Sequence, residues 1–178
     1  MNKVFIGGSI KLSKINKEIK RRIDNIINKR YTVLIGDANG IDKSVQQYLL
    51  SKNYSEVVVF CSGSQCRNNV GNWEVKYIEA NDGLKGRNLY ALKDIQMAKE
   101  TDFGMMVWDG RSTGTFNNIM NLIKFNKKIL VYFSPKKLFY TISNVNDLEL
   151  ICSEKTEKKL FSDIFETSKE SSTIQEEI

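Results

Sequence analysis

The chain has 178 residues, of which 41% are hydrophobic and 27% charged, a composition that is ordinary for a globular protein and excludes a fibrous or disordered chain. It contains no histidine, so histidine-dependent triads, imidazole acid–base catalysis and the commonest zinc and iron sites are excluded. The net charge of +6 favours an anionic partner such as a nucleotide or a nucleic-acid backbone, although compositional bias toward lysine and asparagine is an equal alternative.

The lengths of the apolar runs and the spacing of the cysteines indicate the cellular compartment of the protein. The longest apolar runs are five residues long, whereas a membrane-spanning helix needs about 20. Lysines within residues 1–20 leave no apolar core for a signal peptide. We therefore predict a cytoplasmic protein without a membrane partner. Cys61, Cys66 and Cys152 are odd in number and widely spaced, which predicts reduced thiols rather than a disulfide framework or a zinc site.

The distribution of charge suggests two parts. From residue 151 onward four lysines face seven carboxylates, which leaves about +9 on residues 1–150. We predict a nucleotide-binding domain at residues 1–150 and an appended element at residues 151–178. That element would consist of an amphipathic helix around Leu160 followed by an acidic, frayed tail.

Strand-like and helix-like segments alternate along the chain. Apolar segments typical of strands are residues 3–6, 31–35, 55–61, 73–78, 103–108 and 128–133. Apolar residues at helical spacing occupy residues 15–27, 41–49, 89–100 and 116–123, with Ser13 placed to cap the first of these helices. Residues 62–88 form a long polar loop around the 73–78 segment.

Two further segments follow Pro135: residues 139–142 as an added strand and residues 145–151 as a short helix or a strand. Strands that alternate with helices predict parallel pairing with helices on both faces. The predicted fold class is therefore α/β, a Rossmann-like three-layer sandwich with a mostly parallel central sheet.

Three glycine-containing turns follow predicted strands. Their residues are Gly7, Gly8 and Ser9; Gly36, Asp37, Ala38, Asn39, Gly40 and Asp42; and Asp109, Gly110, Arg111, Ser112, Thr113, Gly114 and Thr115. In parallel sheets, ligands bind beyond the carboxyl ends of the strands, where helix N-termini present unpaired N–H groups. Each turn alone is more typical of a tight turn, and none matches the dinucleotide or Walker motifs. Together they favour a phosphate-bearing ligand.

The second and third turns, with Lys93-Asp94 and Met97-Ala98 between them, resemble the SLOG superfamily, which includes the Smf/DprA and LOG groups. The YspA-like branch is most similar, and the third turn is also similar to nucleoside 2-deoxyribosyltransferases. The resemblance covers roughly residues 3–133. It implies a Rossmann-like, homo-oligomeric domain that binds nucleotides or nucleotide-derived ligands. We expect no cofactor and no metal. Some members are glycosidic-bond hydrolases and others are sensors or nucleic-acid binders.

One position departs from the enzymes of this group. The LOG enzymes and the deoxyribosyltransferases carry a catalytic glutamate on the helix after the third turn. If Gly114-Thr115 is the matching pair, Asn118 stands at the glutamate position. An amide is neither a nucleophile for this reaction nor a general base. We therefore expect the protein to sense or sequester its ligand, with Arg87 and Arg111 on phosphate and Asp109 on sugar.

Two alternatives remain. The first is an enzyme, either a nucleoside or nucleotide N-glycosidase or a deoxyribosyltransferase-like enzyme. It would use Asp37, Asp42 or Asp109, with Asp94 also near the ligand edge. For Asp42 the competing interpretation is a charge that complements a helix N-terminus, and for Asp109 a bond within its own turn. The second alternative is single-stranded nucleic-acid binding, which the basic body favours. Trp108 either stacks on a base or fills the strand end, and Trp73 is a candidate lid residue.

Overall fold

The structure is a computed structural model that describes residues 1–78, 87–152 and 162–163. A seven-stranded sheet forms its centre, in the order β4-β3-β2-β1-β5-β6-β7. The strands are β1 (Lys3–Gly8), β2 (Thr32–Gly36), β3 (Val57–Ser62), β4 (Glu74–Ile78), β5 (Phe103–Trp108), β6 (Lys128–Phe133) and β7 (Leu138–Ile142). All neighbouring pairs are parallel except β6 and β7. The predicted α/β Rossmann-like sheet is confirmed.

The strand order reverses beside β1. The chain builds β2, β3 and β4 outward on one side of β1 and then returns to place β5 against its other edge. Such a reversal leaves a crevice beyond the carboxyl ends of the two central strands, because the connections leave in opposite directions. The loops after β1 and β5 therefore meet at this point.

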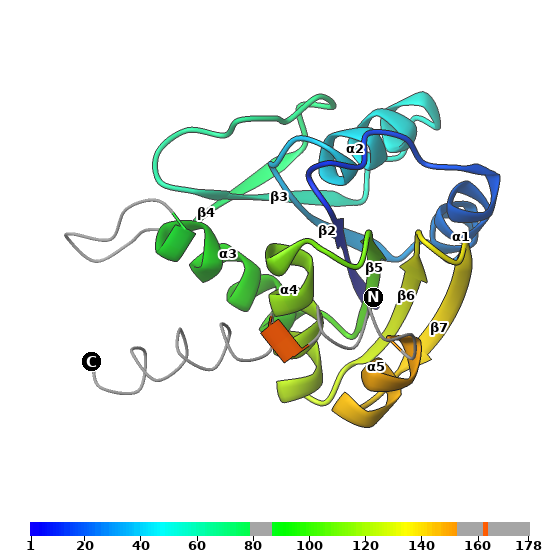
Figure 1. Cartoon of the computed structure of the whole chain (residues 1–178). Helices are drawn as coiled ribbons and strands as arrows, with labels where there is room; N and C mark the ends of the chain where they lie inside the picture. The colour runs from blue at the N-terminus through cyan, green and yellow to red at the C-terminus, as the bar shows by residue number, and fades with distance from the viewer. Residues whose placement is uncertain (79–86, 153–161, 164–178) are drawn as a thin grey trace.

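Helices cover both faces of the sheet (Figure 1). They are α1 (Lys17–Asn28), α2 (Ile41–Ser51), α3 (Arg87–Glu100), α4 (Thr113–Lys124) and α5 (Val145–Ile151). Successive strand residues point to opposite faces, so Val4 and Ile6 belong to the core that includes residues of α1 and α2. Phe5 belongs to the core that includes residues of α3, α4 and α5. The sheet thus separates two hydrophobic cores, each closed by the apolar stripe of its helices.

Polar side chains cap the starts of α1, α4 and α5. The predicted cap Ser13 is wrong: α1 begins at Lys17, and Asn16 Oδ1 accepts a hydrogen bond of 3.0 Å from the Ile19 amide. Ser112 caps α4 in the same way. Residues 145–151, left open between helix and strand, form a helix because Asn144 and Asp147 make a reciprocal capping box. The predicted helix around Leu160 and the acidic tail lie outside the described residues.

The cysteine prediction needs correction. Cys61 at the end of β3 is disulfide-bonded to Cys66, whereas reduced thiols were expected. The chain doubles back after β3 and brings the two Cα atoms to 5.2 Å, within the range that a disulfide spans. An odd cysteine count cannot reveal such a local turn. Within the part of the chain that the structure describes, no helix has the length and apolarity needed to cross a membrane.

Candidate functional site

A cavity of about 560 Å³ lies beside the carboxyl ends of β1 and β5. Its walls come from the loops after β1, β2, β3 and β5 and from α2, α3 and α4. The residues that line it are Phe5, Gly8, Ile10, Lys11, Ala38, Asp42, Arg67, Tyr90, Ala91, Lys93, Asp94, Met97, Asp109, Arg111, Ser112, Thr113, Gly114, Thr115, Asn117, Asn118 and Asn121. The volume is that of a small-molecule site, and its position is the one where open parallel sheets bind ligands.

One end of the cavity is the N-terminus of α4. The amides of Arg111 and Ser112 donate to Asp109 Oδ1 at 2.9 and 2.8 Å, which fixes the turn. Among the described residues the amides of Thr113 and Gly114 have no acceptor, as is usual for the first turn of a helix. These two N–H groups and the helix dipole make this end, the anion end, suited to a phosphate.

Ser9 joins the loops after β1 and β5. Its buried hydroxyl accepts a hydrogen bond of 3.2 Å from the Asp109 amide and lies 3.4 Å from Thr115 Oγ1. Its own amide donates to Val107 O at 3.0 Å. Ser9 therefore holds the turn after β5 against β1, and this turn positions the anion end.

The opposite end of the cavity carries Asp42, Lys93 and Asp94. Lys93, only 4% exposed, pairs with Asp94 at 2.6 Å, and Asp42 Oδ2 accepts a hydrogen bond of 3.3 Å from the Ala38 amide. Gly36 makes room for this cluster, since a Cβ there would lie 2.5 Å from Asp42 Oδ2 and 3.0 Å from Lys93 Nζ. A side chain at position 36 would displace the charged groups.

The protonation of this cluster follows from burial and from its mixed charges. Burial raises the pKa of Asp42 to about 7, against the attraction of Lys93 and with the help of the Asp94 charge. Burial disfavours the charged form of Lys93, but Asp94 and Asp42 outweigh it, so the pKa of Lys93 lies above its ordinary value. The cavity therefore holds a lysine cation, and a carboxyl that titrates near neutrality.

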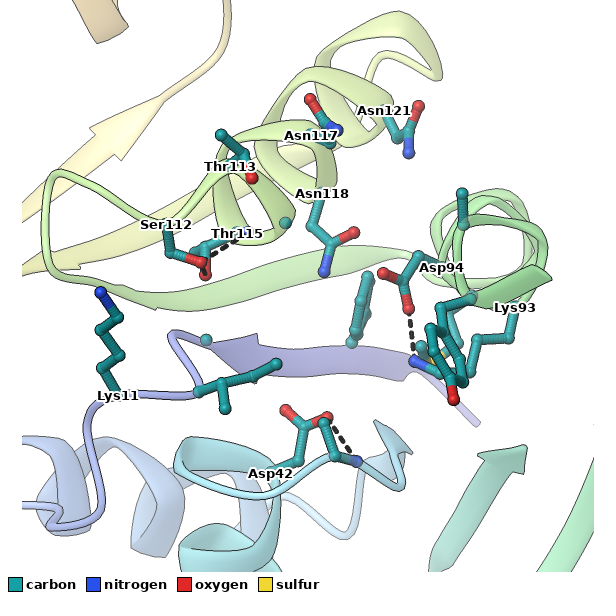
Figure 2. A pocket seen from close by; sticks show the side chains of 18 of the residues that line it. Lys11, Asp42, Lys93, Asp94, Ser112, Thr113, Thr115, Asn117, Asn118 and Asn121 are labelled. Carbon is teal, nitrogen blue, oxygen red and sulfur yellow. Dashed lines mark hydrogen bonds and ion pairs between the residues drawn. The ribbon is translucent and has the colours of Figure 1, made fainter. Parts of the chain in front are cut away.

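Asn118 points from α4 into the cavity, toward the space that Asp42 and Asp94 also face (Figure 2). It is 8% exposed, and its Oδ1 is buried without a hydrogen-bond partner among the described residues. Buried side-chain amides in folded proteins are normally satisfied. Asn118 is thus a polar group that faces the cavity and that the described part of the protein leaves unpaired.

The buried carboxylate of Asp37 pairs with Arg67, a partly exposed residue that lines the cavity. Arg67 Nη2 and Nε donate to the two carboxylate oxygens at 2.6 and 3.1 Å, and the Arg67 amide donates at 3.0 Å. Burial disfavours the Asp37 charge, but the hydrogen bonds from Arg67 hold its pKa below the ordinary value. The guanidinium also lies 4.3 Å from the centre of the Tyr90 ring, so it connects β2 with α3.

A metal site was not predicted, and the described residues offer one group to consider. Ligand atoms of Asp37, Cys61 and Cys66 lie within 4.8 Å of one another. The two sulfurs are bonded to each other, and both Asp37 oxygens already accept hydrogen bonds from Arg67. A cation here would need reduced cysteines and displacement of the arginine, so this group does not suit a metal as it stands.

The structure brings many of the predicted site residues together. Those that line the cavity are Gly8, Ala38, Asp42, Asp109, Arg111, Ser112, Thr113, Gly114, Thr115 and Asn118. Those that do not are Gly7, Ser9, Gly36, Asp37, Asn39, Gly40 and Gly110. The side chain of Arg87 lies outside the described part of the chain. Several of the residues that miss the cavity shape its walls, as Ser9 and Gly36 do.

Other residues of the cavity were missed or underrated from the sequence. Lys11 follows the first turn by two residues, and this closeness was the available signal. Tyr90, Lys93, Asp94 and Met97 recur at a spacing of three or four residues along α3, which places them on one face of the helix. Including polar residues in the helical pattern of α3 would have identified this face of the helix as a wall of the cavity.

The tryptophans take structural positions. Trp108 is 1% exposed and packs against Phe116 and Phe133, so it fills the strand end. The indole Nε1 of Trp73 donates to Tyr54 O at 2.9 Å, and the ring packs against the core shared with α2. Trp73 therefore anchors the segment before β4.

Comparison with known proteins identifies the fold but no family. No family model and no curated protein matches the chain. The chain is similar in structure to DNA processing protein A from Helicobacter pylori, a protein described for its single-stranded DNA binding mode. The TM-score is 0.53 at 14% sequence identity, and the similarity covers 73% of this chain and 64% of that one. The DprA-like fold is confirmed, whereas the YspA-like branch stays a prediction.

Proposed function

We propose that the chain binds a nucleotide or a nucleotide-derived small molecule in the cavity, with a phosphate at the anion end. The observation that carries this proposal is the pair of unbonded amides of Thr113 and Gly114 at the cavity wall. Lys11 and Arg111 line the same end and add positive charge, and arginine suits a two-point grip on phosphate oxygens. The remaining volume is large enough for a sugar and a base.

Binding without turnover is favoured over catalysis. Two of the predicted catalytic carboxylates have structural partners. Asp37 is paired with Arg67, and Asp109 accepts hydrogen bonds from two amides of its own turn. Asn118 has no acid–base chemistry to offer. Asp42 lines the cavity with a pKa of about 7, so it is the carboxyl on which an N-glycosidase alternative would depend.

Calorimetric titration tests the binding proposal. The wild-type chain is titrated with the four ribonucleoside monophosphates, with their di- and triphosphates, with cyclic nucleotides and with ADP-ribose. We expect at least one to bind and Arg111→Ala to weaken it roughly 10-fold or more, the size expected for one charge-assisted hydrogen bond. Arg21→Ala removes a 66% exposed charge on α1 and should leave affinity unchanged. Absence of binding across the whole panel would overturn the proposal.

A second candidate function is binding of single-stranded DNA. The structural neighbour, with its single-stranded DNA binding mode, and the basic net charge both favour it. A protein surface that binds a DNA strand along its backbone contacts many of its phosphates at once. Binding of an oligonucleotide that free mononucleotides do not displace, and that Arg111→Ala leaves intact, would favour this candidate over the cavity ligand.

A further inference from the structure

The two ends of the cavity have opposite hydrogen-bonding chemistry. The anion end presents donors: the amides of Thr113 and Gly114, with the cations of Lys11 and Arg111. At the far end the Lys93 cation is paired with Asp94. The acceptors there are Asn118 Oδ1, which has no partner among the described residues, and the carboxyls of Asp42 and Asp94. Figure 2 shows Asn118, Asp42 and Asp94 pointing into the same space from α4, α2 and α3. We call these three residues the acceptor end.

We infer that the acceptor end binds the free vicinal hydroxyls of a ribose whose 5′-phosphate occupies the anion end. The inference rests on the proposed function and names its ligand class: a ribonucleotide or another ribose 5-phosphate derivative with both hydroxyls unsubstituted. The anion end then binds the phosphate and the acceptor end binds the ribose hydroxyls of the same molecule. The base faces the remaining walls of the cavity.

The amide of Asn118 is the first argument. It is 8% exposed, and its buried Oδ1 accepts no hydrogen bond from any described residue, so the side chain leaves a polar atom unpaired in the cavity. A hydroxyl both donates and accepts, which allows it to satisfy the amide oxygen or the amide nitrogen. A methylene group in its place would leave the buried amide unpaired.

The carboxyl of Asp42 is the second argument. Its Oδ2 accepts from the Ala38 amide, while its Oδ1 has no hydrogen-bond partner among the described residues. Asp94 is occupied on one oxygen by Lys93. An acidic side chain that accepts from a ribose hydroxyl is a recurrent device in Rossmann-like sheets. The acceptor end therefore offers Asp42 Oδ1 and the Asn118 amide to two neighbouring hydroxyls.

Spacing along α4 is the third argument. Gly114 and Asn118 are four residues apart, so they lie on one face of the helix, about 6 Å apart along its axis. This is of the order of the separation between the 5′-phosphate and the hydroxyls of one ribose. A strand of DNA lacks the 2′-hydroxyl and has its internal 3′-oxygens esterified, so the acceptor end also discriminates against an internal DNA nucleotide.

The experiment compares matched sugars. The wild-type chain is titrated with ribose 5-phosphate, 2-deoxyribose 5-phosphate and inorganic phosphate, and then with each ribonucleoside monophosphate beside its 2′-deoxy counterpart. We expect the ribo form to bind at least ~10-fold more tightly in each pair that binds, because the deoxy form leaves buried polar groups unpaired. Equal affinities for ribo and deoxy forms would overturn the inference while leaving the proposed function intact. Failure of every nucleotide to bind would overturn the proposed function itself.

A variant assigns the preference to Asn118. Asn118→Leu keeps the approximate shape of the side chain and removes an unpaired buried amide, so the fold should persist, as a thermal melt would show. The ribo preference should fall to within ~3-fold of unity. Asn25→Leu, on the exposed side of α1, is the matched control and should retain the preference. Asn118→Ala serves if the leucine variant does not fold. Retention of the full preference in a folded Asn118 variant would overturn the assignment.

Discussion

At the scale of single residues, the carboxylates that look alike in the sequence have different environments. Asp37 is ionised and held by Arg67, whereas Asp42 is buried beside a lysine and a second carboxylate. These differences arise from interactions between residues 30 and 51 positions apart in the sequence, Asp37 with Arg67 and Asp42 with Lys93. The sequence pattern could place the acids at the correct sheet edge, but it could not distinguish their partners.

The raised pKa of Asp42 predicts a dependence of stability on pH. The unfolded carboxyl has a pKa of about 3.9, and the folded one about 7. The folded state binds more protons between these values, so the contribution of Asp42 to stability is present below pH 4 and is lost as pH rises through 7. Asp37, Lys93 and Asp94 are the charged groups that act on it.

Asp42→Asn removes this dependence while keeping an acceptor for the Ala38 amide. We expect the variant to match the wild type near pH 4 and to exceed it by roughly 2–4 kcal/mol at pH 8. Lys93 keeps Asp94 as its partner. Urea denaturation at a series of pH values measures the difference, and a difference that does not grow between pH 4 and pH 8 would contradict the assigned pKa.

A substitution at Gly114 should change ligand affinity without lowering the stability of the fold. It lies at the exposed start of α4, and a Cβ there would meet no atom within 4 Å. Gly114→Ala should therefore keep or raise stability, by up to ~1 kcal/mol from helix propensity, while crowding the anion end. We expect nucleotide affinity to fall at least several-fold with an unchanged or higher melting temperature. Unchanged affinity in calorimetry would mean that the ligand does not approach this turn.

At the scale of elements, the disulfide fixes the segment that carries Arg67. Cys61 lies one residue before the end of β3, and Cys66 is bonded to it. Arg67 follows Cys66 directly and reaches Asp37 and the cavity wall. The bond therefore restrains the residue before Arg67, whose guanidinium pairs with the buried Asp37 carboxylate. Strand and helix order could be predicted because the apolar periodicity is local. This bond could not, because it depends on how the loop after β3 turns.

Cys66→Ser tests the restraint. Closing so short a loop removes enough unfolded-chain entropy to predict a loss of about 2 kcal/mol, and a looser Arg67 should also weaken ligand binding. Reduction of the wild-type disulfide with a dithiol should reproduce both effects, and adding the dithiol to Cys66→Ser should change nothing further. A variant as stable as the oxidised wild type would show that the bond does not restrain the folded protein.

At the scale of the whole molecule, the two candidate functions differ in their response to salt. A mononucleotide in the cavity carries few charges, so we expect its affinity to fall less than ~10-fold between 50 and 200 mM salt. If the protein contacts about six phosphates of a DNA strand, its affinity for that strand should fall roughly 10²- to 10³-fold over the same range. Titration of both ligands at several salt concentrations separates a cavity ligand from a surface-bound strand, because only the second has the steep slope.

The central position of β1 has a consequence for how the chain folds. One edge of β1 pairs with β2, about 30 residues later, but its other edge pairs with β5, where Phe5 lies opposite Gly104. Contacts this distant in sequence form slowly, because a long loop must close first. During synthesis β1 therefore keeps an open hydrogen-bonding edge until residues 103–108 have been made. For that interval the innermost strand of the finished protein is an exposed edge, which is the kind of surface that recruits chaperones or drives aggregation.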